Sequence, residues 1–174
     1  MIFGSKVVDF IKQQATVLLA GAGDIQSSAP KAAAGEDQEG LVLLTSMMGA
    51  LYMGAGIDGE ITDTEYEALA KLFSEVTEGA CVDEEFDALF EKTADLIDEE
   101  GFESAIADIA KNVTDAEQRQ SVLTIAIAAA CAAGDQGDEI EEEKRLFIHD
   151  MAAAFGISQE QLEAYYTEVD AQTN

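Results

Sequence analysis

Apolar residues recur three or four positions apart along most of this chain, which is the spacing of one face of an α-helix. No segment shows the sustained apolar–polar alternation with β-branched residues that is typical of a strand. The single proline stands at position 30, and alanine, leucine and glutamate, which favour helices, are abundant. The pattern therefore predicts an all-α protein.

A compact bundle of about seven helices is expected after residue 40, with an N-terminal helix and a linker before it. Two of the seven, 41–53 and 117–133, are rich in small residues, which allows them to pack closely against each other. The first helix and residues 122–133 of the second are almost uniformly apolar, which favours burial on most sides. The others are amphipathic, and Gly101 separates two of them. Residues of the capping type precede four expected helix starts, namely Thr62, Asp83, Thr114 and Ser158.

The composition divides the chain into three parts. Residues 1–20 predict an amphipathic helix, residues 21–40 a flexible linker around Pro30, and residues 41–174 the helical domain. We interpret the first helix as packing on the domain; a weak membrane contact through residues 1–20 is the alternative. No uninterrupted apolar stretch reaches the roughly 18 residues of a membrane span.

The charge balance narrows the choice of partners. The formal net charge is −27, from 36 acidic and 9 basic residues. Such a surface repels the phosphates of nucleic acids and anionic membranes, so neither is an expected partner. Cations and basic protein surfaces are the natural partners, unless the charge serves solubility alone. The two cysteines, Cys81 and Cys131, form no CxxC motif, and a reduced cytoplasmic location is expected.

Two acid-rich segments each stand between an apolar helical run and a new helix start. The first, residues 54–65, reads GAGIDGEITDTE, and the second, residues 134–144, reads GDQGDEIEEEK. Each contains glycine for a turn, an isoleucine to pin that turn, and carboxylates on either side. Carboxylate and carbonyl oxygens on a turn are the ligands that hard divalent cations prefer. The unpaired carbonyls at the end of each preceding helix add negative charge, so a cation is expected there.

The first segment matches part of an EF-hand loop. Counted from Gly54, Asp58 is fifth and Glu65 twelfth, but the first and third positions are glycines. For the second segment two registers remain open. Aligning Ile140 with Ile61 places Lys144 where Glu65 stands, and a shift by one residue places Glu143 there instead. Candidate metal ligands are Asp58, Glu65, Asp135, Asp138 and Glu143.

The segments GIDGEITDTEYEALAKLF and AIAAACAAGDQGDEIEEEKRLFIHDMAAAFGIS resemble the TerB-like family of tellurite-resistance proteins. The resemblance covers roughly residues 40–168, and Asp58, Gly59, Ile61 and Glu65 stand at the family's positions. It implies an all-helical repeat whose clustered acids bind a divalent metal ion. It also implies an accessory role in tellurite or chemical-stress resistance rather than a known catalytic activity.

Three functional hypotheses follow from these observations. The first is a non-enzymatic, cytoplasmic domain that binds Ca²⁺, or else Mg²⁺ or Mn²⁺, through both acidic loops. The second is an interaction module whose charge binds a basic partner without metal. The third, a metal-dependent hydrolase, ranks lowest: His149 is the only histidine, and no nucleophile-elbow, Walker or dinucleotide-binding motif is found.

Overall fold

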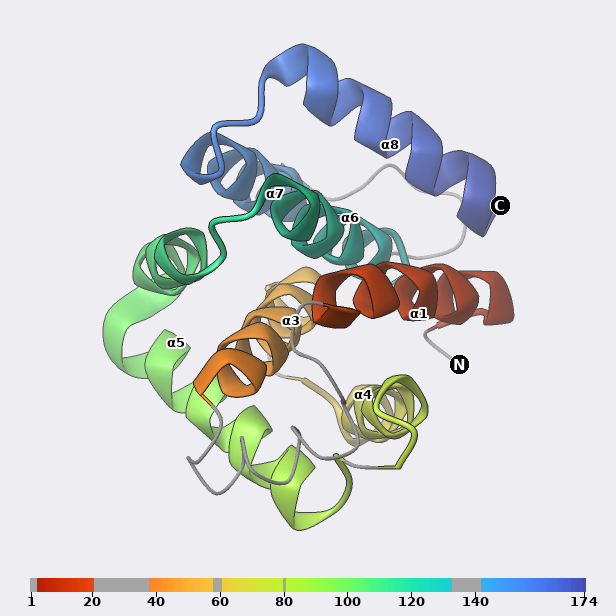
Figure 1. The fold of residues 1–174 in the computed structure, drawn as a ribbon, viewed down its shortest axis with the longest axis vertical. Coiled ribbons are helices and arrows are strands. Elements are labelled where there is room, and N and C mark those ends of the chain that lie inside the picture. The colour runs from red at the N-terminus through yellow and green to blue at the C-terminus, as the bar shows by residue number, and fades with distance from the viewer. Residues whose placement is uncertain (1–2, 21–37, 58–60, 80, 133–141) are drawn as a thin grey trace.

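A computed structural model of the protein describes residues 3–20, 38–57, 61–79, 81–132 and 142–174. These parts of the chain contain seven α-helices and no strand, so the predicted all-α class is confirmed (Figure 1). The helices are α1 (Ser5–Leu19), α3 (Gln38–Gly56), α4 (Asp63–Val76), α5 (Glu84–Asn112), α6 (Ala116–Ala132), α7 (Glu142–Ala154) and α8 (Gln159–Thr173).

Helices α3 and α6 cross at the centre of the bundle (Figure 1). Every residue from Ser121 to Ala130 of α6 is buried, as the nearly uniform apolar pattern predicted. The crossing is close because Gly54 of α3 has no side chain. A Cβ atom at this position would lie 2.8 Å from the carbonyl oxygen of Ala126 and 2.9 Å from Cβ of Ala129. Three methionines of α3 fill the surrounding core, namely Met47, Met48 and Met53.

Helix α1 packs against α6 and also contacts α4, α8 and α3. Its apolar face, including Phe10, Ile11 and Leu18, belongs to the same core as the central helices. Lys12 of α1 also forms an ion pair with Glu75 of α4, at 3.0 Å between Nζ and Oε2. None of the helices in the described parts of the chain is long and apolar enough to cross a membrane.

Helix α5 is bent at Gly101, the position where the sequence predicted a break. Gly101 has φ 84° and ψ 169°, which lies outside the helical region and in a region that favours glycine. The two halves of α5 therefore take different directions, and Figure 1 shows the helix curving around one side of α3.

Two of the predicted helix starts are confirmed in detail. Thr62 and Glu65 form a reciprocal capping box at the start of α4. Ser158 forms the same arrangement with Gln161 at the start of α8. Each cap satisfies backbone N–H groups that have no partner inside the helix.

The other two starts differ from expectation. Helix α6 is capped by Asp115, whose Oδ1 accepts hydrogen bonds from the backbone nitrogens of Glu117 and Gln118, both at 3.0 Å. The carboxylate of Asp115 is a stronger acceptor than the hydroxyl of Thr114, which stands one residue earlier. Asp83 precedes α5 but its side chain makes no capping hydrogen bond, because its backbone has φ 46° rather than the extended conformation of a usual cap.

Arg119, near the start of α6, joins three helix ends. Its guanidinium donates to the carbonyl oxygens of Val113 at 2.7 Å, Ala110 at 2.9 Å and Phe155 at 3.3 Å. It also lies over the ring of Phe155, with 5.6 Å between Cζ and the ring centroid. The side chain thus satisfies carbonyls at the C-terminal ends of α5 and α7.

Candidate functional site

The first acidic segment connects α3 to α4 and begins later than the sequence predicted. Gly54, Ala55 and Gly56 belong to the last turn of α3 and are buried. Gly54 therefore packs between helices and is not the first residue of an EF-hand loop. The connection is short, since α3 ends at Gly56 and α4 begins at Asp63.

Ile61 packs against the end of α3, which is the pinning contact that the sequence predicted. A Cβ atom on Gly56 would lie 2.7 Å from Cγ1 and 3.2 Å from Cδ1 of Ile61. Ile57 and Ile61 are both half-buried against the hydrophobic core. The two described ends of the connection are therefore held together by an apolar contact.

Glu65 is positioned by the first turn of α4. Its Oε2 accepts hydrogen bonds from the backbone nitrogen of Thr62 at 2.7 Å and from the Thr62 hydroxyl at 2.8 Å. A carboxylate in this place is also stabilised by the partial positive charge of the helix N-terminus. Both bonds use the same oxygen, and the second oxygen of a carboxylate can bind a metal ion at the same time.

The C-terminal ends of α3 and α6 lie beside each other. The close contact of Gly54 with Ala126 and Ala129 joins the last turn of α3 to the last two turns of α6. With a rise of about 1.5 Å per residue, α3 ends about 3 Å beyond Gly54 and α6 ends about 4.5 Å beyond Ala129. The partial negative charges of two helix ends are therefore adjacent, and one acidic segment follows each of them.

Burial in α4 and α7 settles the register between the two halves of the chain. The first half is α3, the first acidic segment and α4, and the second half is α6, the second acidic segment and α7. The core residues of α4 are Leu69, Leu72 and Phe73, and the residues 79 positions later are Ile148, Met151 and Ala152, which are also buried. A shift by one residue would instead pair buried Leu72 with exposed Asp150. Ile140 is therefore the counterpart of Ile61, as in the first of the two open registers.

In this register Lys144 stands at the position of Glu65. Lys144 is fully buried in the first turn of α7, whereas Glu143 is exposed and corresponds to Thr64. This burial could not be predicted from the sequence, because a lysine near three glutamates normally belongs to a solvated surface. Helices α4 and α7 are thus alike in their buried core positions, but they carry residues of opposite charge, Glu65 and Lys144, at equivalent positions.

Of the five candidate ligands, the structure places Glu65 and Glu143. Asp58, Asp135 and Asp138 lie outside the described residues. Within the described ranges, no group of three or more His, Cys, Asp or Glu side chains is arranged to hold a metal ion.

Cys131 lies next to the second acidic segment, near the end of α6. Partial desolvation, reinforced by the charge of Asp170, raises the pKa of its thiol to about 11, although the residue is exposed. The thiol therefore stays protonated at neutral pH in the protein without a bound ion.

Comparison with known protein families assigns the chain to a family. Residues 45–166 match the family described as tellurite resistance protein TerB. The match covers more than two thirds of the chain, from the first half of α3 into α8. The chain belongs to the TerB family. Searches for similar curated proteins and for similar solved structures found no match. The TerB match includes both acidic segments, whereas α1 precedes it.

Proposed function

We propose that this TerB protein is a non-enzymatic, cytoplasmic domain that binds a divalent cation through its two acidic segments. The ligands are Asp58 and Glu65 from the first segment and Asp135, Asp138 and Glu143 from the second. Ca²⁺ is the ion of first choice, with Mg²⁺ or Mn²⁺ as alternatives. The family assignment supports a role in the response to tellurite or to chemical stress.

The observation that carries the proposal is the adjacency of the C-terminal ends of α3 and α6. Each helix end bears about half a negative charge, and a carboxylate-rich segment follows directly. Bringing these groups together is unfavourable unless a positive charge lies between them. A divalent cation supplies that charge and binds carbonyl and carboxylate oxygens at once.

Buried Lys144 supports an unequal division of the site. Its ammonium group brings a positive charge into the second half, at the position where the first half has the carboxylate of Glu65. The first half should therefore contribute more to binding the ion, and Glu65 should matter more than Glu143.

Calorimetric titration of the full chain with Ca²⁺, Mg²⁺, Mn²⁺ and Zn²⁺ tests the proposal. We expect binding of the oxygen-preferring ions, with a stoichiometry of one if both segments share the site. Saturation at about 100 times Kd should raise Tm by about 5–10 °C. The Asp58→Asn variant should lose this rise, and Asp150→Asn, an exposed carboxylate of α7, should keep it. An unchanged calcium response in Asp58→Asn would refute the assignment.

Two further variants test the sharing of the site. Asp138→Asn should also weaken binding, because a single site needs ligands from both segments. Glu65→Gln should weaken binding more than Glu143→Gln. If Asp138→Asn binds as tightly as the unaltered protein, the first segment binds the ion alone and the shared site is wrong.

A further inference from the structure

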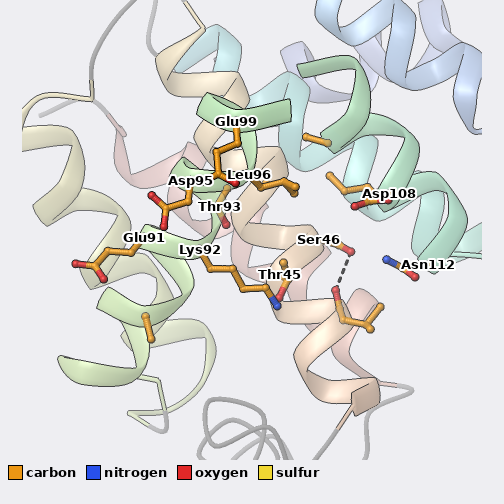
Figure 2. Close-up of a pocket in the computed structure, with 15 residues that line it drawn as sticks. Thr45, Ser46, Glu91, Lys92, Thr93, Asp95, Leu96, Glu99, Asp108 and Asn112 are labelled. Atoms are coloured by element: carbon orange, nitrogen blue, oxygen red, sulfur yellow. Dashed lines mark hydrogen bonds between the residues drawn. The ribbon is translucent and has the colours of Figure 1, made fainter. Parts of the chain in front are cut away.

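An open cavity of about 660 Å³, called the groove below, lies between helices α3 and α5 (Figure 2). No residue of the acidic segments lines it. It is lined by α3 between Val42 and Gly49 and by both halves of α5, before and after the bend at Gly101. The first acidic segment follows the opposite end of α3, beyond Gly56, and the second follows the end of α6. The cavity therefore has no part in the proposed metal site.

Buried Gly49, Ala105 and Ile109 form the floor of this groove, and Gly49 of α3 faces Ile109 of the second half of α5. Half-buried Leu96 and exposed Ala88 line the groove from the first half of α5. Apart from Thr93, the lining residues of each helix segment follow the i, i+3, i+4, i+7 spacing of one helical face. Three helical faces thus surround a space that none of the described helices fills.

Carboxylates dominate the rim. Glu91, Asp95 and Glu99 stand four residues apart along the first half of α5, and Asp108 stands on the second half; all four are exposed. Lys92 is the one cation among the lining residues, and in Figure 2 it extends from α5 toward Thr45. The rim is therefore strongly negative on a protein that is itself negative.

One hydroxyl in the groove has no hydrogen-bond partner among the described residues. Oγ1 of Thr45 is buried and makes no hydrogen bond within these ranges, whereas the hydroxyls of Ser46 and Thr93 donate to the carbonyl oxygens of Val42 at 2.7 Å and Leu89 at 2.9 Å. A buried polar atom without a partner is unfavourable. A polar group of a bound molecule would satisfy it.

We propose that this groove binds a basic amphipathic helix of a partner protein. The apolar floor accepts a stripe of alanine and leucine, the helical spacing of the walls matches a helix laid between them, and the acidic rim pairs with flanking lysines or arginines. The hydroxyl of Thr45 can form a hydrogen bond with a polar side chain of the same partner helix. This inference goes beyond metal binding and does not depend on it.

A helical probe peptide tests the proposal directly. Residues 88–99 of α5 span about 16 Å, so a fluorescein-labelled peptide of about 14 residues covers the groove. The probe carries alanine and leucine on one face and lysine on its flanks. A second peptide with glutamate in place of lysine serves as the control. Binding to the full chain is measured by fluorescence anisotropy with and without a chelator, and the contact is mapped by backbone amide shifts.

The matched variants are Asp95→Lys/Glu99→Lys on the rim and Glu160→Lys/Glu163→Lys at two exposed positions of α8. Both change the net charge equally. We expect the rim variant to raise Kd at least about tenfold and the α8 variant to change it by less than about threefold. Amide shifts should fall on residues 42–49 and on α5, and the glutamate peptide should not bind.

Three results would overturn the proposal. Equal weakening in both variants would show a general attraction to negative charge. Self-association of the unmodified chain that the rim variant abolishes would assign the groove to a second copy. Probe binding that appears only when residues 21–37 are replaced by a Gly-Ser sequence of equal length would assign the groove to that segment.

Discussion

Gly54 is the residue on which the central helix crossing depends most directly, and Gly54→Ala perturbs it by a single methyl group. The new Cβ would meet the Ala126 carbonyl oxygen at 2.8 Å and Cβ of Ala129 at 2.9 Å. Both distances are at least a few tenths of an ångström shorter than van der Waals contact. Both atoms are fixed by the backbone of α6 and cannot rotate away. The two helices must therefore separate.

The magnitude follows from two opposing terms. Overpacking a tight core costs about 1–3 kcal/mol, and the rigid neighbours place Gly54 at the upper end of that range. Alanine is favoured over glycine within a helix by about 1 kcal/mol. The net loss should be about 2 kcal/mol, which for a chain of 174 residues lowers Tm by about 4–8 °C.

Gly49→Ala is the matched control, since Gly49 is buried in the same helix. Its Cβ would lie 2.9 Å from Cδ1 of Ile109, the end of a flexible side chain that can rotate away. The gain in helix preference should offset this adjustment, leaving stability within about 0.5 kcal/mol of the original. Urea denaturation and thermal melts measure both variants. Equal stability of the two variants would refute the reasoning from rigid and flexible neighbours.

Three further predictions concern the caps and the buried thiol. Arg119→Lys should lower the free energy of unfolding by about 2–3 kcal/mol, because an ammonium cannot reach the carbonyls of Ala110, Val113 and Phe155 together. Urea denaturation measures this loss, and Lys111→Ala, at an exposed position, is the near-neutral control. Thr62→Ala should cost about 1 kcal/mol through loss of the α4 cap, and a loss below a few tenths in thermal melts would contradict it. Burial, followed by the charge of Glu85, raises the pKa of the Cys81 thiol from 9.0 to about 12. The stabilisation from this thiol is complete below pH 9 and disappears as the pH rises toward 12, so Cys81→Ala should show a shallower fall in stability over that window.

The sequence predicted those features that depend on local pattern. Helical periodicity identified the described helices, Gly101 marked the bend, and the Thr62–Glu65 spacing gave the α4 cap. Ala and Gly content predicted the close crossing of α3 and α6, since small residues are what such a crossing requires. The predicted start of the first loop was wrong by three residues, because the glycine-rich sequence Gly54–Gly56 suits both a turn and a tightly packed helix end.

Features that depend on tertiary contacts were not accessible from the sequence. The register of the second half became clear only when Ile148, Met151 and Ala152 proved to be buried. Lys144 resembles a surface lysine until its burial is known. The groove between α3 and α5 was also missed, because its lining comes from three helical faces whose relative placement no local pattern encodes.

The packing of α1 has a consequence for where the folding unit begins. Ile11, Ala15 and Leu18 of α1 are completely buried, and α1 lies chiefly on α6, one of the two central helices. A protein trimmed to the family match at residues 45–166 would leave that side of α6 exposed to water. Such a fragment should aggregate, so the evolutionary boundary of the domain and its physical boundary differ by a whole helix.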